Sequence, residues 1–290
     1  MDFYNDTLSL ADEALELPKG NQFALAQING FQVVMILEAS SYLHRLEANQ
    51  FSIFTQKFHK SISKTLKHFE GEVLKEDDHT YLVVFTSATN AVLCALKIHA
   101  NFKYITPKFD KDGRRLKIGI SSFTGDKAKG NPIFKAIAAA SRISSFVEDE
   151  LVVSPGIKIL YEKENRNARI DRELVRVLKP KEGSFLNRLV NCCAKMYSNP
   201  DFNVAALGEQ MQLGQSQLYR KVMRLTGKAP SIFIREYKLR RAIGRLHEHA
   251  HGTISQVARE SGFRNPTYFT KCFNDRFGIL PSKYIQQHSF

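Results

Sequence analysis

One pattern of apolar residues occurs twice near the end of this 290-residue chain. Each copy has two sets of apolar residues at helical spacing, separated by a short break, and each copy ends in Gly-x-x-Pro. Gly227 and Pro230 of the first copy recur 51 residues later as Gly278 and Pro281. The repeat therefore predicts two small units of the same design, each built from a pair of helices.

The breaks between the paired sets predict a tight turn in each unit. In the first copy we expect the turn at Leu213-Gly214, where glycine can adopt a positive φ, and we expect Ser216 to cap the next helix. In the second copy Gly262 is expected to form the turn. One long helix, from Ser231 to about Glu248, is predicted between the units. The expected inward residues of the paired helices are Val204, Ala205, Leu207, Met211, Leu218, Val222 and Leu225, and then Ile254, Val257, Ala258, Phe269, Phe273 and Phe277.

A helix-turn-helix unit of this kind places its second helix in the major groove of DNA. The second helices are predicted at about 216–225 and 266–277, and we expect them in neighbouring groove segments about 34 Å apart. The predicted DNA-binding residues are Gln215, Ser216, Gln217, Tyr219, Arg220, Lys221, Arg264, Asn265, Thr267 and Lys271. The predicted contacts to base edges or adjacent phosphates are Gln215, Gln217, Arg220, Asn265, Thr267 and Lys271. Arginine pairs with guanine, and asparagine or glutamine with adenine.

Positive charge is concentrated in the same part of the chain. Residues 185–290 hold 16 lysines and arginines against 6 aspartates and glutamates, whereas residues 1–184 hold 26 against 23. A basic surface neutralises phosphates and releases counterions when it binds nucleic acid. The charge and the motif together favour DNA binding over a helical bundle with a solvated basic surface. Four cations of the long helix are expected to hold phosphates or to stay solvated: Arg235, Lys238, Arg240 and Arg241.

Residues Phe185–Tyr284 closely resemble the DNA-binding domain of the AraC/XylS family of bacterial transcription regulators. The resemblance rests on the two helix-turn-helix patterns, on Asn199-Pro-Asp-Phe-Asn-Val204 and on the signature Pro266-Thr-Tyr-Phe269. It implies an all-α tandem helix-turn-helix domain, a double-stranded DNA operator as partner and contact with RNA polymerase.

The preceding part of the chain predicts an α+β sandwich, in which helices cover one face of a mixed sheet. Strands are expected at 31–37, 71–75, 81–85, 116–120, 151–154 and 172–178, and helices at 51–69, 88–102 and 132–146. The chain is therefore predicted to comprise a peripheral arm (1–22), this first domain (23–180), a linker (181–184) and the DNA-binding domain (185–290).

Several phrases of the first domain resemble the catalytic domain of class III nucleotidyl cyclases. They are His68-Phe-Glu-Gly-Glu-Val-Leu-Lys75, Leu82-Val-Val-Phe-Thr-Ser-Ala88, Lys117-Ile-Gly-Ile120 and Ala138-Ala-Ala-Ser-Arg-Ile143. The resemblance implies that Lys75, Asn131 and Arg142 are the residues that would contact a nucleotide.

Cyclase chemistry requires two carboxylates that hold two divalent metal ions, and this sequence departs from the family at both positions. The first position falls at Ile36, which cannot ligate a hard cation, and the second holds Asp78-His79 in place of Gly-Asp. Glu38 and Asp78 are the alternative carboxylates, and Ala138 stands where the family has asparagine. We therefore predict a domain with no metal site and no catalytic residues, whose one candidate ligand is a nucleotide effector.

Three roles remain open for such a domain. It would join two copies as a homodimer, sense a nucleotide through Lys75, Asn131 and Arg142, or retain turnover through displaced carboxylates. In the simpler interpretation Lys75 is a solvated lysine and Arg142 forms an ion pair on a helix surface. The predicted function is a sequence-specific DNA-binding transcription regulator that is not an enzyme. The alternative is an active class III cyclase fused to a DNA-binding domain.

The expected location of the chain is the cytoplasm. No run of eighteen apolar residues predicts a membrane span, and the acidic start of the chain lacks the basic segment of a secretory signal. The cysteines at 94, 192, 193 and 272 lack the spacing of metal ligands or of a disulfide framework.

Overall fold

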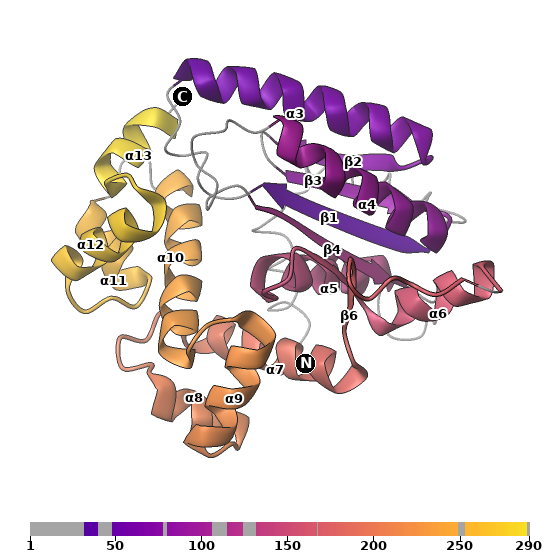
Figure 1. Cartoon of the computed structure of the whole chain (residues 1–290). Helices are drawn as coiled ribbons and strands as arrows, with labels where there is room; N and C mark the ends of the chain where they lie inside the picture. The colour runs from indigo at the N-terminus through magenta and orange to yellow at the C-terminus, as the bar shows by residue number, and fades with distance from the viewer. Residues whose placement is uncertain are drawn as a thin grey trace. The chain divides into compact units, whose positions relative to one another are not determined.

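The computed structural model of this chain describes residues 32–39, 48–77, 80–105, 115–123, 132–166, 168–248 and 253–288. The predicted arm (1–22), Asp78, His79 and Asn131 lie outside the described residues. The chain forms two compact units, with the boundary between Ser184 and Phe185. The first unit contains the strands together with helices, and the second contains helices (Figure 1).

The first unit is built on a six-stranded mixed sheet with the strand order β2-β3-β1-β4-β5-β6. β1 is antiparallel to both β3 and β4, whereas β5 is parallel to β4 and β6 is parallel to β5. The strands are β1 (Val33–Ala39), β2 (Glu72–Asp77), β3 (Thr80–Phe85), β4 (Leu116–Ser122), β5 (Leu151–Val153) and β6 (Arg176–Val177). The helices are α3 (Ala48–His68), α4 (Ala88–Ile105), α5 (Pro132–Phe146) and α6 (Pro155–Glu164). The predicted mixed sheet with helices is confirmed.

Helices cover both faces of this sheet. Val34 and Ile36 of β1 pack against Ile137 and Ala140 of α5. Met35 points to the opposite face and is also fully buried, and α4 packs against β1, β3 and β4. Figure 1 shows α4 and α5 on opposite sides of the sheet. The prediction of helices on one face is therefore wrong, because the continuous apolar run of β1 needs cover on both faces.

Three other local predictions also need correction. The last strand is only Arg176–Val177, not 172–178, and α6 between β5 and β6 was not predicted. Residues 181–184, predicted as a linker, lie in the first turns of α7 (Pro180–Met196). The glycine and serine there do not break the helix, because Pro180 can begin it and Glu182 lies in its first turn, where a negative charge is favourable.

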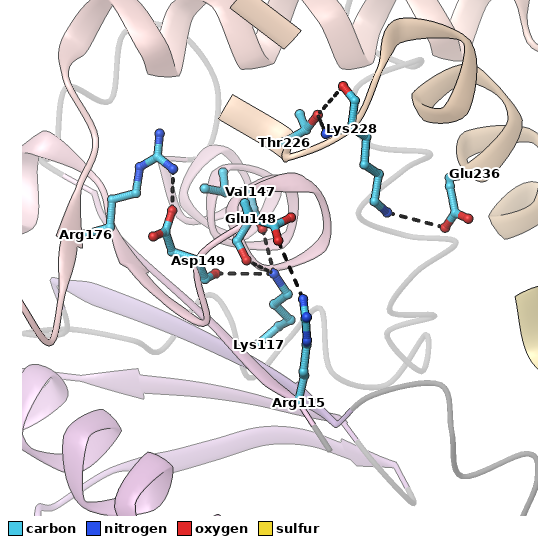
Figure 2. Close-up of polar contacts among 9 residues, drawn as sticks. All are labelled: Arg115, Lys117, Val147, Glu148, Asp149, Arg176, Thr226, Lys228 and Glu236. Carbon is cyan, nitrogen blue, oxygen red and sulfur yellow. Dashed lines mark hydrogen bonds and ion pairs between the residues drawn. The ribbon is translucent and has the colours of Figure 1, made fainter. Parts of the chain in front are cut away.

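A lysine holds the turn between α5 and β5 (Figure 2). The Nζ atom of Lys117, on β4, donates to the carbonyl oxygens of Val147 (2.9 Å), Glu148 and Asp149 (3.4 Å). A cation is favourable here because these carbonyls follow the negative end of the α5 dipole. Arg115 pairs with Glu148 and Arg176 pairs with Asp149, so both neighbouring strands contribute to the same turn.

The second unit contains two helix-turn-helix pairs joined by one long helix, so the tandem arrangement is confirmed. Its further helices are α8 (Val204–Met211), α9 (Gln215–Thr226), α10 (Pro230–Glu248), α11 (Ile254–Glu260), α12 (Pro266–Phe277) and α13 (Pro281–His288). We call residues 185–229 the first half and residues 253–288 the second half. The linking helix α10 contacts α8 and α9 of the first half and α11 and α13 of the second.

The two second helices, α9 and α12, have the same length and the same ending. Each has twelve residues and is closed by a left-handed glycine, Gly227 (φ 65°) or Gly278 (φ 71°). The amide of each glycine donates to a carbonyl one turn earlier, at Met223 and Asn274 respectively. The 51-residue spacing of these glycines therefore reflects the shared helix C-cap.

The turns that precede α9 and α12 differ, and the first turn was predicted incorrectly. Gln212 adopts the left-handed conformation (φ 53°), whereas Gly214 has a φ of −62° and is the N-cap of α9. Ser216 consequently lies inside α9 rather than at its cap. In the second half Gly262 has a φ of +76°, as the sequence predicted.

Gly119 of β4 is a position that requires glycine, because α5 passes directly over it. A Cβ atom at Gly119 would lie 2.2 Å from the carbonyl oxygen of Ala140 and 2.7 Å from the amide nitrogen of Ser144. Both atoms belong to the backbone of α5, so a side-chain rotation cannot relieve the clash. The close packing of α5 on the sheet thus depends on this glycine.

We predict that Gly119→Ala lowers the free energy of unfolding of the first unit by about 1–3 kcal/mol or more, since α5 must shift to admit the methyl group. Urea unfolding of the full chain followed by circular dichroism measures the loss. The matched control is Gly183→Ala in α7, where an added Cβ meets nothing within 4 Å. Equal unfolding midpoints for the two variants would contradict the close approach.

Candidate nucleic-acid interface

The inner faces of α9 and α12 are apolar and buried. Leu218 and Val222 of α9 are fully buried, as are Phe269 and Phe273 of α12. The α12 residues belong to one cluster with Leu239 of α10 and other residues of the second half. The two helices are therefore fixed through their inner faces, and their other faces carry polar side chains.

All ten predicted DNA-binding side chains are exposed. The two helices also present them in the same register, because Gln215 and Pro266 are the first residues of α9 and α12. Ser216 corresponds to Thr267, and Arg220 corresponds to Lys271. Each helix thus offers a hydroxyl in its first turn and a cation one turn later on a surface open to solvent.

Asn265 has a structural function that its predicted role did not include. It is the N-cap of α12, and its side-chain oxygen accepts hydrogen bonds from the amides of Thr267 (2.8 Å) and Tyr268 (3.3 Å). A bidentate contact with adenine needs both the oxygen and the amide nitrogen of asparagine. The capping contact occupies the oxygen and leaves the nitrogen for a donor contact.

Two other predicted residues make contacts within the domain. Arg264 pairs with Asp201, and their side chains are 70% and 68% exposed, respectively. Lys221 lies with its Nζ atom 5.5 Å from the centre of the Phe185 ring. Exposed pairs of this kind contribute little to stability, so either cation can exchange its partner for a phosphate.

Sequence reasoning missed Tyr268 as a candidate contact. Its side chain is 51% exposed in the first turn of α12, at the position that corresponds to Gln217 of α9. A hydrogen bond with Tyr268 raises the pKa of Arg235, which is half-buried on α10. The repeat register was the signal that could have identified Tyr268, because Gln217 was already a predicted contact.

The expectation that Lys238 binds a phosphate or stays solvated is wrong. Lys238 is only 7% exposed, and its Nζ atom donates to the carbonyl oxygens of Gly262 (2.9 Å) and Asn199 (3.4 Å). Burial lowers the pKa of Lys238. Arg241 lies over the Tyr197 ring, with its guanidinium carbon 5.0 Å from the ring centre. Lys238 and Arg241 therefore take part in contacts within the domain.

Two positions at which the sequence departs from the cyclase pattern, Ile36 and Ala138, lie in or against the apolar core of the first unit. Ile36, at the first carboxylate position, is 3% exposed and packs in the apolar cluster beneath α5. A buried hydrocarbon side chain at this position offers no oxygen ligand to a divalent metal ion. Ala138 packs against the same cluster.

The two described residues of the predicted nucleotide site lie on different elements. Lys75 is half-buried on the edge strand β2, opposite Leu82, and Arg142 is in α5, which packs on β1 and β4. Arg142 is 7% exposed, so the interpretation of a surface ion pair for it is wrong. Nucleotide contact by these residues stays a prediction.

The described residues lack two further features, a metal-binding cluster and a membrane-spanning helix. No three histidine, cysteine, aspartate or glutamate side chains among them are grouped so that they could hold a metal ion. Within the same residues, no helix combines the length and the apolar character needed to cross a membrane.

Parts of the sequence match a known domain family and a known protein. Residues 207–287 match the family model of a helix-turn-helix domain. A 92-residue segment is 35% identical to a protein of Formosa agariphila named histidine kinase P4. The match covers 32% of this chain and 7% of that protein, so the chain corresponds to a small part of its relative.

Several solved structures of low sequence identity resemble parts of this chain. The DNA-binding domain of AdpA in complex with a target DNA is 24% identical and covers 35% of this chain and 92% of its own, with a TM-score of 0.32. A probable AraC family transcriptional regulator from Rhodopseudomonas palustris is 20% identical, covers 35% and 94%, and has a TM-score of 0.32. A bacterial light-regulated adenylyl cyclase is 16% identical, covers 54% and 56%, and has a TM-score of 0.35. On the strength of the family match, residues 207–287 of this chain form a helix-turn-helix domain.

Proposed function

We propose that this chain is a sequence-specific transcription regulator that reads DNA through α9 and α12. The observation that carries the proposal is the matched pair of polar faces on these helices. Both helices have the same length, the same glycine C-cap and a buried apolar inner face. Side chains that serve only solubility have no need of matched register on two helices held by one linking helix.

The chemistry of these faces suits double-stranded DNA. Arg220 and Lys271 provide cations, Gln217 provides an amide, and Ser216 and Thr267 provide hydroxyl groups, all of them exposed. Such groups bind phosphates and read base edges in the major groove. The excess of 16 basic over 6 acidic residues in 185–290 adds the non-specific attraction to phosphates that precedes specific binding.

For the first unit we propose a role without turnover, in which it joins two copies of the chain and can place DNA binding under the control of a nucleotide. The burial of Ile36 supports the loss of catalysis, because the cyclase reaction needs an oxygen ligand at that position. A homodimer would double the number of recognition helices on one operator. Sedimentation of the full chain tests this role, and a monomer at micromolar concentration would contradict it.

Arg220 is expected to contact a base edge in the major groove. We expect Arg220→Ala to weaken binding to a duplex selected from a random library by about 1–3 kcal/mol and to relax the preference at one base pair. Fluorescence anisotropy with the selected duplex and a scrambled duplex measures the effect. The matched control is Arg172→Ala, which removes an exposed arginine from the first unit. An equal loss on both duplexes would make Arg220 a phosphate contact instead.

Two substitutions of Asn265 can separate its capping role from base reading. We expect Asn265→Ala to cost about 1 kcal/mol of stability because the amides of Thr267 and Tyr268 lose their acceptor. Asn265→Ser keeps a capping oxygen and should restore both the stability and most of the DNA affinity. Thermal melting and anisotropy provide the two readouts. If the serine variant melts normally but still binds DNA as weakly as the alanine variant, the amide nitrogen reads a base.

The first unit is expected to lack cyclase activity. We expect no cyclic nucleotide when the full chain is incubated with ATP or GTP and Mg²⁺ or Mn²⁺, because Ile36 cannot bind a metal ion. A nucleotide sensor would still be stabilised by ligand, by about 2.7 kcal/mol at a hundredfold excess over Kd. The melting shift should be metal-independent and absent in Lys75→Ala, with Lys67→Ala as the control for one lost lysine. Product formation would favour the alternative of an active cyclase.

A further inference from the structure

We propose that three polar side chains of the linking helix, Glu236, Lys238 and Arg245, set the spacing of the two recognition helices and thereby the spacing of half-sites that this chain accepts on DNA. Each of the three contacts one group from the first half and one from the second. The inference rests on the proposed DNA-binding function and concerns how the two halves are positioned, since none of these side chains is a predicted base contact.

Glu236 joins the ends of the two recognition helices. Its Oε2 atom accepts a bond from Nε of Arg276 (2.6 Å) and lies 3.4 Å from Nζ of Lys228. Lys228 directly follows the glycine cap of α9, and Arg276 lies in the last turn of α12. Figure 2 shows the ion pair between Lys228 and Glu236.

Glu236 is largely buried, and its carboxylate is kept charged by its two cationic partners. The Glu236 side chain is only 16% exposed. Burial by itself would raise the pKa of Glu236, but the charges of Arg276 and Lys228 outweigh burial and hold that pKa below its usual range. If Arg276 or Lys228 moved away, the largely buried carboxylate of Glu236 would lose an ion-pair partner, and water would replace that partner poorly. The carboxylate therefore stabilises the positions of both cations.

Lys238 makes a second bridge, through backbone atoms. Its Nζ atom donates to the carbonyl oxygen of Asn199, which precedes α8, and to that of Gly262, in the turn before α12. The backbones also meet directly at this point, since a Cβ atom on Gly262 would lie 1.9 Å from the carbonyl oxygen of Tyr197. The turn at Gly262 therefore packs directly against the backbone of the first half.

Arg245 makes the third bridge, two turns further along α10. Its guanidinium group donates to the hydroxyl oxygen of Tyr197 (2.9 Å) and to Oε2 of Glu260 (2.7 Å). Tyr197 follows α7, and Glu260 ends α11. The three bridges are distributed along α10, so together they restrain rotation as well as separation of the halves.

Polar bridges and apolar packing have different consequences for geometry. Apolar contacts are non-directional, and they allow helices to slide when the buried area is preserved. Hydrogen bonds and ion pairs require set distances and angles. A domain held in this way should bind two half-sites only at one separation, because one inserted base pair moves the second groove by about 3.4 Å and turns it by roughly 35°.

The experiment compares half-site spacing in the full chain. Wild-type protein is used to select a duplex from a random library, and one or two base pairs are then inserted between its two contacted segments. We expect one insertion to weaken wild-type binding about tenfold or more. In Glu236→Gln the same insertion should cost at least about threefold less, while each isolated half-site binds both proteins equally.

Asp275→Asn is the matched control, because it removes one acidic charge from an exposed position beside Arg276. It should retain the wild-type insertion penalty. Arg245→Lys tests a second bridge and keeps the charge but loses the planar pair of donors. If Glu236→Gln does not fold, as judged by circular dichroism, Arg245→Lys gives the same comparison.

Spin labels provide a readout that does not need DNA. Labels at Gln217→Cys and Thr267→Cys, in a Cys192→Ser background, report the distance between α9 and α12, since Cys94, Cys193 and Cys272 are buried. The distance distribution should broaden in Glu236→Gln and remain narrow in Asp275→Asn.

The spacing proposal would be overturned if Glu236→Gln and Arg245→Lys left both the insertion penalty and the distance distribution unchanged. DNA binding would then remain intact. Failure of the wild-type chain to select any duplex would overturn the proposed function, and the spacing proposal with it. The two failures are distinguishable because only the second is shared by the wild-type protein.

Discussion

Lys238 carries its ammonium group into the interior of the second unit, where two backbone carbonyls from different halves of the domain accept its hydrogen bonds. A buried ammonium group without such acceptors would cost several kcal/mol or lose its proton. The carbonyl oxygen of Asn199 also accepts from the amide of Phe202, and Lys238 adds the contact that joins this carbonyl to that of Gly262. The positions of Asn199 and Gly262 therefore depend on each other through one side chain, and the placement of α8 and α12 depends on both.

The first unit is organised around a different constraint, the close contact between α5 and the sheet. Gly119 admits the backbone of α5, and Lys117 two residues earlier holds the turn in which α5 ends. Ile36 lies in the same layer and belongs to one apolar cluster with Ile137 and Ala140 of α5. This layer is therefore part of the apolar core of the unit.

Much of the helical domain could be predicted because its signals are local. The apolar residues of α12 recur every four positions, and Gly278 with Pro281 marks its end, so its bounds were predicted correctly. The turn at Gln212 could not be read in this way, since glutamine rarely adopts a positive φ and the neighbouring Gly214 was the better candidate. The burial of Lys238 also escaped prediction, because its partners are backbone carbonyls that are distant in sequence. The cover of the second face of the sheet also escaped prediction, because it depends on contacts between residues that are distant in sequence.

The three bridges of α10 have a consequence for how the second unit folds. Each bridging side chain is satisfied only when both halves are in place, since its partners come from both. Unfolding of one half would leave partly buried charges of α10 without partners and would expose the apolar face of that helix. Intermediates with only one half folded are therefore high in free energy, and the two duplicated halves should fold and unfold as a single cooperative unit rather than as two independent repeats.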